Sequence, residues 1–256
     1  MRVNLQPAYV IHSRPYRDTS ALLEVFTAEY GRISLVARGT RRQTRRGSKA
    51  AMLQPFSPLL LSFSGRKELK TLIAAEPVKG MSMLRGERLF SGLYVNELLA
   101  RLLHRNDAHP KLFAAYDSSL KALAGNVAVD RILREFEMIL LEELGYGLNL
   151  GLDGASGDPV DRTLRYRYDS GLGLVASDNA TNGSAETYLG ADLLAIESGE
   201  LEGSVRQAAK RLLRQVLAVH LGDLPLHSRE LFRVRRASVP STGEVRHNRT
   251  RSGDLS

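Results

Sequence analysis

The chain of 256 residues contains no cysteine. This absence excludes disulfide bonds, thiolate metal sites and a cysteine nucleophile, and it is typical of proteins from a reducing compartment. The sequence also has no run of about eighteen apolar residues, and the N-terminal stretch MRVNLQPAYVIHSRP lacks the apolar segment of a signal peptide. We therefore predict a soluble, cytoplasmic protein that does not enter a membrane.

Motifs for catalysis and for metal binding are missing as well. The six histidines are scattered, and neither an HExxH zinc motif, a GxxxxGK[ST] phosphate loop nor a GxSxG nucleophile motif occurs. The acids Asp153, Asp158 and Asp161 lie in a glycine-rich stretch, but they do not have the spacing of an EF-hand. We predict that the protein is not an enzyme, has no catalytic residues and uses no metal or cofactor.

Acidic residues are scarce at the N-terminal end of the chain. Residues 1–80 contain 14 Lys and Arg against 5 Asp and Glu, residues 81–228 contain 15 against 20, and residues 229–256 contain 7 against 3. The net charge of +8 therefore resides in a basic head and a basic tail. Because basic surfaces attract polyanions, the head is where we expect nucleic acid to bind.

The positive charge is densest in residues 38–49, which read RGTRRQTRRGSK and include no acid. The strand-like run ISLVA precedes this segment, and the run LLLSF follows it at residues 59–63. We interpret the segment as a long loop between two strands. Such dense like charges repel one another unless a polyanion neutralises them, which favours a nucleic-acid contact.

Short β-like runs separated by turns fill the first 75 residues. Tyr30-Gly31-Arg32 is a good hairpin signal, because glycine adopts positive φ at little cost. Five short strands in this space predict a small closed barrel; the OB-fold is the first candidate, and spacing alone leaves an SH3-like barrel open. We expect the strands at residues 8–12, 22–27, 33–37, 59–63 and 69–74.

Beyond residue 80 the apolar period changes from two to about 3.6, which indicates helices. The predicted helices span residues 87–105, 110–123, 131–144, 205–221 and 228–234. Taken together, the pattern predicts an α+β protein: a five-stranded barrel at 1–80 and an α-helical domain at 81–236. This domain has a small inserted β and loop element at about 149–182, and a disordered basic tail follows at 237–256.

Several short motifs together resemble the RecO family of bacterial recombination mediators. They occur in the family's order and extend over nearly the whole chain, so the resemblance is specific although each motif alone is weak. The motifs are YVIHSRPY at 9–16, LVARG at 35–39, LQPFSPL at 53–59, NELL at 96–99, EELGYG at 142–147 and PLHSRELF at 225–232.

This resemblance implies an N-terminal OB-fold, a helical C-terminal domain and a non-enzymatic role in RecF-pathway repair. Members bind single- and double-stranded DNA, anneal complementary strands, act with RecR on DNA coated by the single-strand binding protein SSB, and help to load RecA. We expect a monomer. Some members have a four-cysteine zinc site after the Gly-Tyr-Gly turn. This sequence lacks those cysteines, so hydrogen bonds and packing must hold its 149–161 loop.

We predict two binding sites. The DNA site consists of cations in or beside the barrel loops, where an OB-fold follows a phosphate backbone: Arg14, Arg17, Arg38, Arg41, Arg42, Arg45, Arg46, Lys49 and Lys70. The partner site receives the SSB tail, which is acidic and ends in an apolar residue with a carboxylate, so it must combine a cation with an apolar surface. Arg131 and Arg134, in a helix with Ile132, Leu133 and Phe136, meet this requirement.

Two other functions were considered. An RNA-binding OB-fold protein of ribosome assembly or RNA metabolism remains an alternative, because grooves that stack bases accept both polymers. A nuclease is disfavoured, because the basic head lacks the clustered carboxylates that would hold catalytic metal ions.

Overall fold

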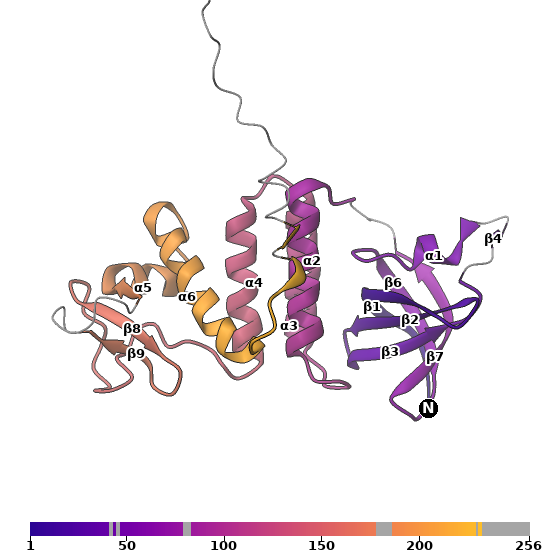
Figure 1. Ribbon diagram of the computed structural model, residues 1–256, viewed down its shortest axis with the longest axis horizontal. Helices are drawn as coiled ribbons and strands as arrows, with labels where there is room; N and C mark the ends of the chain where they lie inside the picture. The colour runs from indigo at the N-terminus through magenta and orange to yellow at the C-terminus, as the bar shows by residue number, and fades with distance from the viewer. Residues whose placement is uncertain (41–42, 45–46, 79–82, 178–185, 229, 232–256) are drawn as a thin grey trace, which may run out of the picture.

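A computed structural model describes residues 1–40, 43–44, 47–78, 83–177, 186–228 and 230–231. A β-barrel occupies one end of the molecule, helices α2, α3 and α4 lie in the middle, and a small sheet with α5 and α6 lies at the other end (Figure 1). The tail predicted at 237–256 is outside the described residues. No helix within the described ranges is long and apolar enough to cross a membrane.

The N-terminal barrel has the predicted five strands, which close in the order β1-β2-β3-β7-β6. Strands β3 and β7 pair in parallel, and the other neighbours pair antiparallel. This arrangement is that of an OB-fold, so the predicted fold class is confirmed. The strands are β1 (Arg2–Tyr16), β2 (Ser20–Thr27), β3 (Gly31–Ala37), β6 (Pro58–Ser64) and β7 (Leu69–Pro77).

The interior of the barrel is filled by alternating apolar side chains. Val10, Leu23, Leu35, Leu61 and Phe63 are completely buried, as the two-residue period of the strands requires. Strand β1 is longer than the sequence predicted because it pairs with both β2 and β6, and each pairing includes a register shift.

Short elements interrupt the connection between β3 and β6. Strands β4 (Gln43–Thr44) and β5 (Gly47–Ser48) pair antiparallel, and a single helical turn, α1 (Lys49–Met52), follows. The segment predicted to be one long basic loop therefore contains a small hairpin. In Figure 1, β4 lies on the side of the barrel away from the helices.

The second half of the chain is mainly helical, as predicted. Helix α4 packs against α2, α3 and α6, and it therefore lies in the centre of this domain. The helices are α2 (Gly86–Leu102), α3 (Pro110–Ala124), α4 (Val129–Glu143), α5 (Gly190–Glu197) and α6 (Gly203–Leu221). The inserted element forms a sheet of order β10-β8-β9, from β8 (Arg165–Asp169), β9 (Gly173–Ala176) and β10 (Thr187–Leu189). Of the helix predicted at 228–234, residues 228 and 230–231 are helical and the rest lie outside the described residues.

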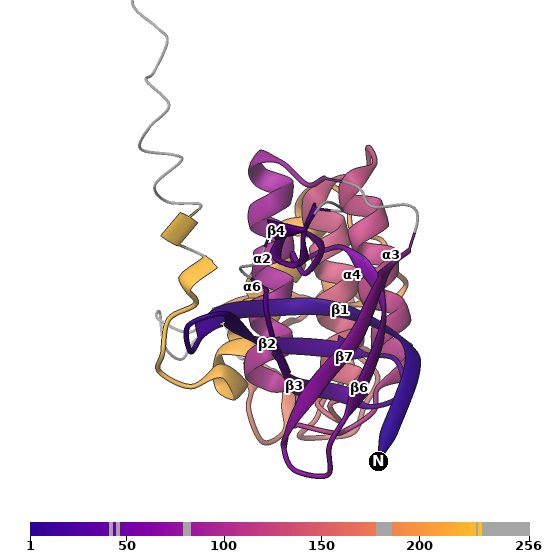
Figure 2. The ribbon, with the colours of Figure 1, turned by 90° about the vertical axis from the view of Figure 1, so that its right-hand side faces the viewer.

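The barrel and the helices share a hydrophobic core. Tyr9, Ile11 and Phe26 lie on barrel strands but belong to the buried hydrophobic cluster of the helical domain. The Tyr9 ring meets that of Tyr116 edge to face, at 5.1 Å between centroids. Seen from the barrel end, the strands lie in front of the helices (Figure 2).

Gly31 allows the two parts to approach closely. Its φ of +59° suits glycine, and a Cβ atom there would collide with the backbone carbonyl of Asp107, which follows α2. The backbone of Asn106 also donates a hydrogen bond to the carbonyl of Arg32, at 2.9 Å. The orientation of the barrel is therefore fixed by backbone as well as side-chain contacts.

Candidate nucleic-acid interface

Exposed cations gather where β1 turns into β2. Tyr16 pairs with Ser20 across this turn, and Arg17 occupies the left-handed region with a φ of +51°, which is uncommon for a residue other than glycine. The Arg17 guanidinium lies 5.4 Å from the centroid of the Tyr16 ring. Arg14 is also exposed, near the end of β1. The turn thus presents two cations, the exposed acid Asp18 and one aromatic ring.

The end of β3 adds further charge at the same end of the barrel. Since β2 and β3 are antiparallel, the start of β2 and the end of β3 lie together, with Ala21 opposite Ala37. Arg38 follows directly and is exposed, and Lys49 is exposed at the start of α1. We refer to Arg14, Arg17, Arg38 and Lys49 as the tip cations. None of the four forms an ion pair with another described residue.

The remaining predicted DNA-binding residues are of two kinds. Arg41, Arg42, Arg45 and Arg46 lie outside the described residues. Lys70 is not part of the surface, contrary to prediction: its side chain is 7% exposed, and its Nζ donates a 2.7 Å hydrogen bond to Asn106 Oδ1. Burial lowers the pKa of Lys70. The residue contributes to the junction between barrel and helices and is unavailable to a phosphate.

The opposite end of β2 and β3 is covered by the same junction. Arg105, which follows α2, donates hydrogen bonds to Ser34 on β3 and to Glu24 on β2, and forms a 3.0 Å ion pair with Glu68 before β7. OB-folds commonly bind oligonucleotides on the face of these strands. Arg105 covers part of that face here, and the exposed cations of the barrel lie at the tip and in the β6–β7 turn, at Arg66 and Lys67.

Comparison with known proteins agrees with this architecture. The family model for the N-terminal part of recombination protein O matches residues 1–81, and that for its C-terminal part matches residues 83–230. A protein from Haemophilus influenzae (strain 86-028NP) named DNA repair protein RecO is 45% identical over 236 residues, which cover 91% of this chain and 97% of that protein. The protein of that name from Shigella flexneri is 45% identical over 230 residues, which cover 89% and 93%. The chain belongs to the RecO family.

Membership of the RecO family gives the chain a role in DNA repair and recombination. The two RecO family models meet between β7 and α2, where the barrel ends and the helices begin.

The predicted partner residue Arg134 is buried in this RecO protein. It is 3% exposed and forms an ion pair with Glu137, whose carboxylate also accepts a 2.7 Å hydrogen bond from the Tyr94 hydroxyl. The expectation that Arg134 presents its charge to a partner is therefore wrong for this structure. The reason is that α4 is surrounded by three other helices, so two of its faces are buried.

Arg131, the other predicted partner residue, is exposed on the first turn of α4 and forms a 2.7 Å ion pair with Glu135. Lys210 on α6 donates a 3.0 Å hydrogen bond to Asp130. Burial opposes ionisation of Asp130, but Lys210, Arg134 and Arg206 nevertheless lower its pKa. The start of α4 therefore presents Arg131 and Lys210, each paired with an acid, together with the half-exposed Val127.

One carboxylate organises the loop at 149–161. Asp153 is buried and accepts backbone hydrogen bonds from Ala155, Ser156 and Ala176 at 2.8, 3.3 and 2.9 Å. Burial raises the pKa of Asp153, but the three hydrogen-bond donors lower it by more, so the pKa is below its ordinary value. Hydrogen bonds therefore hold this loop, as expected from the lack of cysteine. The described residues contain no group of three or more side chains able to hold a metal ion.

Proposed function

We propose that this RecO protein binds single- and double-stranded DNA at the barrel tip and anneals complementary strands. The supporting observation is the group of tip cations, which are exposed and have no acidic partner among the described residues. They flank the segment with four further arginines at 41, 42, 45 and 46. Annealing requires two negatively charged backbones to approach each other, and a surface that neutralises phosphates lowers that repulsion.

The proposed role is that of a mediator. The protein acts with RecR on DNA coated by SSB and helps to load RecA, in the cytoplasm and as a monomer. No chemical step and no cofactor are needed, because bringing strands together changes only non-covalent contacts. The support for this wider role is membership of the RecO family.

The DNA site is tested by replacing Arg14, Arg17 and Arg38 with alanine and titrating single-stranded DNA at several salt concentrations. Each phosphate contact contributes about 0.7 to the slope of log affinity against log salt for single strands, so the slope should decrease by about 2. The matched control replaces Arg206, Arg211 and Arg214, which are exposed on α6 and carry the same total charge. This control should keep the wild-type slope.

Equal slopes for the tip variant and the wild type would contradict the proposed site. Annealing of SSB-coated complementary strands, measured with and without an RNA competitor of equal length, then distinguishes the alternative. If the protein functions in RNA metabolism, an equal concentration of RNA should displace the DNA and stop annealing. The proposed mediator should continue to anneal the DNA strands.

We further propose that the SSB tail binds at the start of α4, through Arg131. Arg131, Arg206 and Lys210 are cations for an acidic tail, which would compete with Glu135 for Arg131 and with Asp130 for Lys210. Val127 offers an apolar contact for the terminal residue of the tail. Arg131→Ala should weaken binding of a tail peptide about fivefold, measured by fluorescence anisotropy, since an exposed charge pair contributes up to about 1 kcal/mol. The matched control is Lys121→Ala, another exposed cation paired with an acid four residues away. Equal loss in both variants would contradict this assignment.

A further inference from the structure

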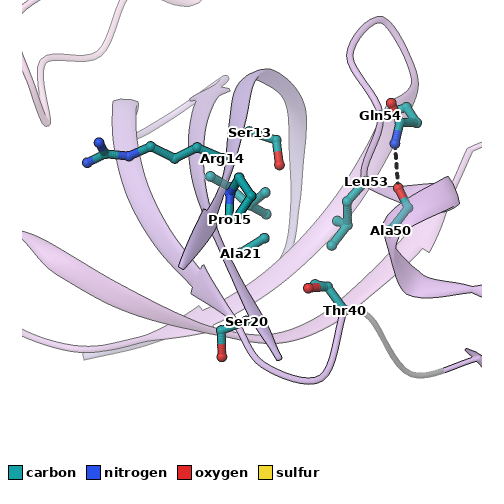
Figure 3. A pocket seen from close by; sticks show the side chains of 10 residues that line it. Ser13, Arg14, Pro15, Ser20, Ala21, Thr40, Ala50, Leu53 and Gln54 are labelled. Carbon is teal, nitrogen blue, oxygen red and sulfur yellow. Dashed lines mark hydrogen bonds between the residues drawn. The ribbon is translucent and has the colours of Figure 1, made fainter. Parts of the chain in front are cut away.

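A pocket of about 170 Å³ opens at the barrel tip between the end of the β1–β2 hairpin and α1 (Figure 3). Its apolar walls come from Pro15, Ala21, Leu23 and Leu53. Ser13, Ser20, Thr40 and Gln54 also line it; the Thr40 hydroxyl donates to the carbonyl of Thr19 and the Gln54 amide to that of Ala50. A cavity of about 150 Å³ is large enough to bind benzene, so this pocket has room for one aromatic ring of similar size.

The pocket exists because small side chains meet where α1 crosses the end of the barrel. Leu53 is 3% exposed and packs into the barrel core, which brings the end of α1 down onto the strands. The Gln54 amide donates a 2.7 Å hydrogen bond to the carbonyl of Ala50, which fixes the turn. Ala21 on β2 and Ala50 on α1 both line the pocket, and their side chains are too small to fill the space between the two elements.

The surroundings of the pocket indicate what enters it. Arg14 belongs to its rim, but in Figure 3 its side chain extends away from the interior. Its charge is therefore placed for a phosphate outside the pocket. Arg17 and Tyr16 lie on the same hairpin, directly between Pro15 and Ser20. An apolar pocket with hydroxyl groups, bordered by cations, matches a nucleotide whose base is inside and whose backbone is outside.

We propose that this pocket receives one unstacked base of single-stranded DNA. The inference rests on the proposed DNA binding at the tip, and it specifies that the protein recognises an unpaired base in addition to the phosphates. The serine hydroxyls both donate and accept hydrogen bonds, and the room for one ring suits a pyrimidine base such as thymine. Bases within a duplex are stacked and paired, and extracting one costs a few kcal/mol. The pocket therefore gives the tip a preference for unpaired strands that charge alone does not provide.

The test compares oligothymidylate with an abasic oligomer of the same length, since the two carry equal charge. Wild-type protein should bind the oligomer with bases at least about fivefold more tightly, as expected when one base contributes 1 kcal/mol or more. Ala50→Leu places an isopropyl group in the pocket and should reduce this ratio toward one. The control is Ala51→Leu, the same substitution at the neighbouring, exposed position of α1, which should keep the wild-type ratio.

Each outcome bears on a different claim. Salt-sensitive DNA binding by the wild type with no difference between the two oligomers would overturn the pocket and leave the proposed tip site intact. Retention of the full ratio in Ala50→Leu would also overturn the pocket, because stacking on an exposed ring such as Tyr16 would then explain the preference. Absence of DNA binding would overturn both. Circular dichroism of the two leucine variants verifies that they share the wild-type fold.

Discussion

At the scale of single residues, Asp153 organises the loop that follows α4 through hydrogen bonds to one carboxylate. Three backbone N–H groups from two separate segments, 155–156 and 176, converge on its two oxygens. The backbone of Asp153 also takes part, since its N–H donates to the carbonyl of Asp158 at 2.8 Å. The inserted sheet is thereby joined to the loop that follows α4.

We predict that Asp153→Ala lowers the free energy of unfolding by about 2 kcal/mol, because three backbone N–H groups lose their hydrogen bonds to a charged acceptor. The pKa of Asp153 is depressed in the folded state, so its contribution is present above the unfolded value of about 3.9 and is lost as the pH falls through the folded pKa. Thermal denaturation at neutral pH should therefore separate the variant from the wild type, and the difference should shrink below about pH 4.

The matched control is Asp158→Ala, an exposed acid of the same loop whose side chain makes no hydrogen bond or ion pair with the described residues. It should denature like the wild type. If both variants lost the same stability, the effect would arise from loop charge in general and the role assigned to Asp153 would be refuted.

Residue patterns predicted the exposed tip cations but not the buried ones. In LKTLIA at 69–74, alternation predicts an apolar interior face, yet Leu69 and Ile73 are exposed and Lys70 is buried. Arg134, predicted to present its charge to a partner, is likewise buried. In both cases an unforeseen partner, Asn106 for Lys70 and Glu137 for Arg134, makes burial of the charged residue tolerable. Such partners are distant or ambiguous in sequence, so burial of a charge could not be predicted.

At the scale of elements, long periodic segments were predictable and short ones were not. The five barrel strands and the main helices follow clear periods of two and 3.6. Strands β4, β5 and β10 contain two or three residues, and α1 contains four, so no period can develop in them. The pocket at the tip is formed by α1 and the ends of strands, and for this reason only its basic rim could be predicted from the sequence.

At the scale of the whole molecule, the junction between barrel and helices determines which surfaces remain free. Asn96 on α2 donates a 3.1 Å hydrogen bond to the carbonyl of Ile11 and accepts one of 2.6 Å from Tyr116. Tyr9 donates to Asp117 on α3 at 2.5 Å. These contacts cover the outer side of β1 and β2 and leave the tip and its cations exposed. The proposed DNA and SSB sites therefore lie on different domains and are able to be occupied together.

From this junction we predict that the isolated barrel self-associates. In the whole chain Tyr9 and Ile11 are 4% exposed and Phe26 is fully buried, all by contact with the helical domain. A fragment of residues 1–81 would expose these side chains, each of which gains roughly 1.5–3 kcal/mol from burial. Contiguous apolar patches of this kind promote association. We expect the fragment to self-associate in size-exclusion chromatography, and the full chain to elute as the proposed monomer.

Charged substitutions in the apolar patch formed by Tyr9, Ile11 and Phe26 should improve the solution behaviour of the fragment and destabilise the full chain. Ile11→Glu combined with Phe26→Glu removes the apolar patch from the fragment and should restore a monomer. The same pair in the full chain places two charges in the shared core and should lower its melting temperature by many degrees, because unpaired buried charges are strongly destabilising. A monomeric, stable wild-type fragment would show instead that the barrel is independent of the helices, and that the junction does not decide which face of the barrel meets DNA.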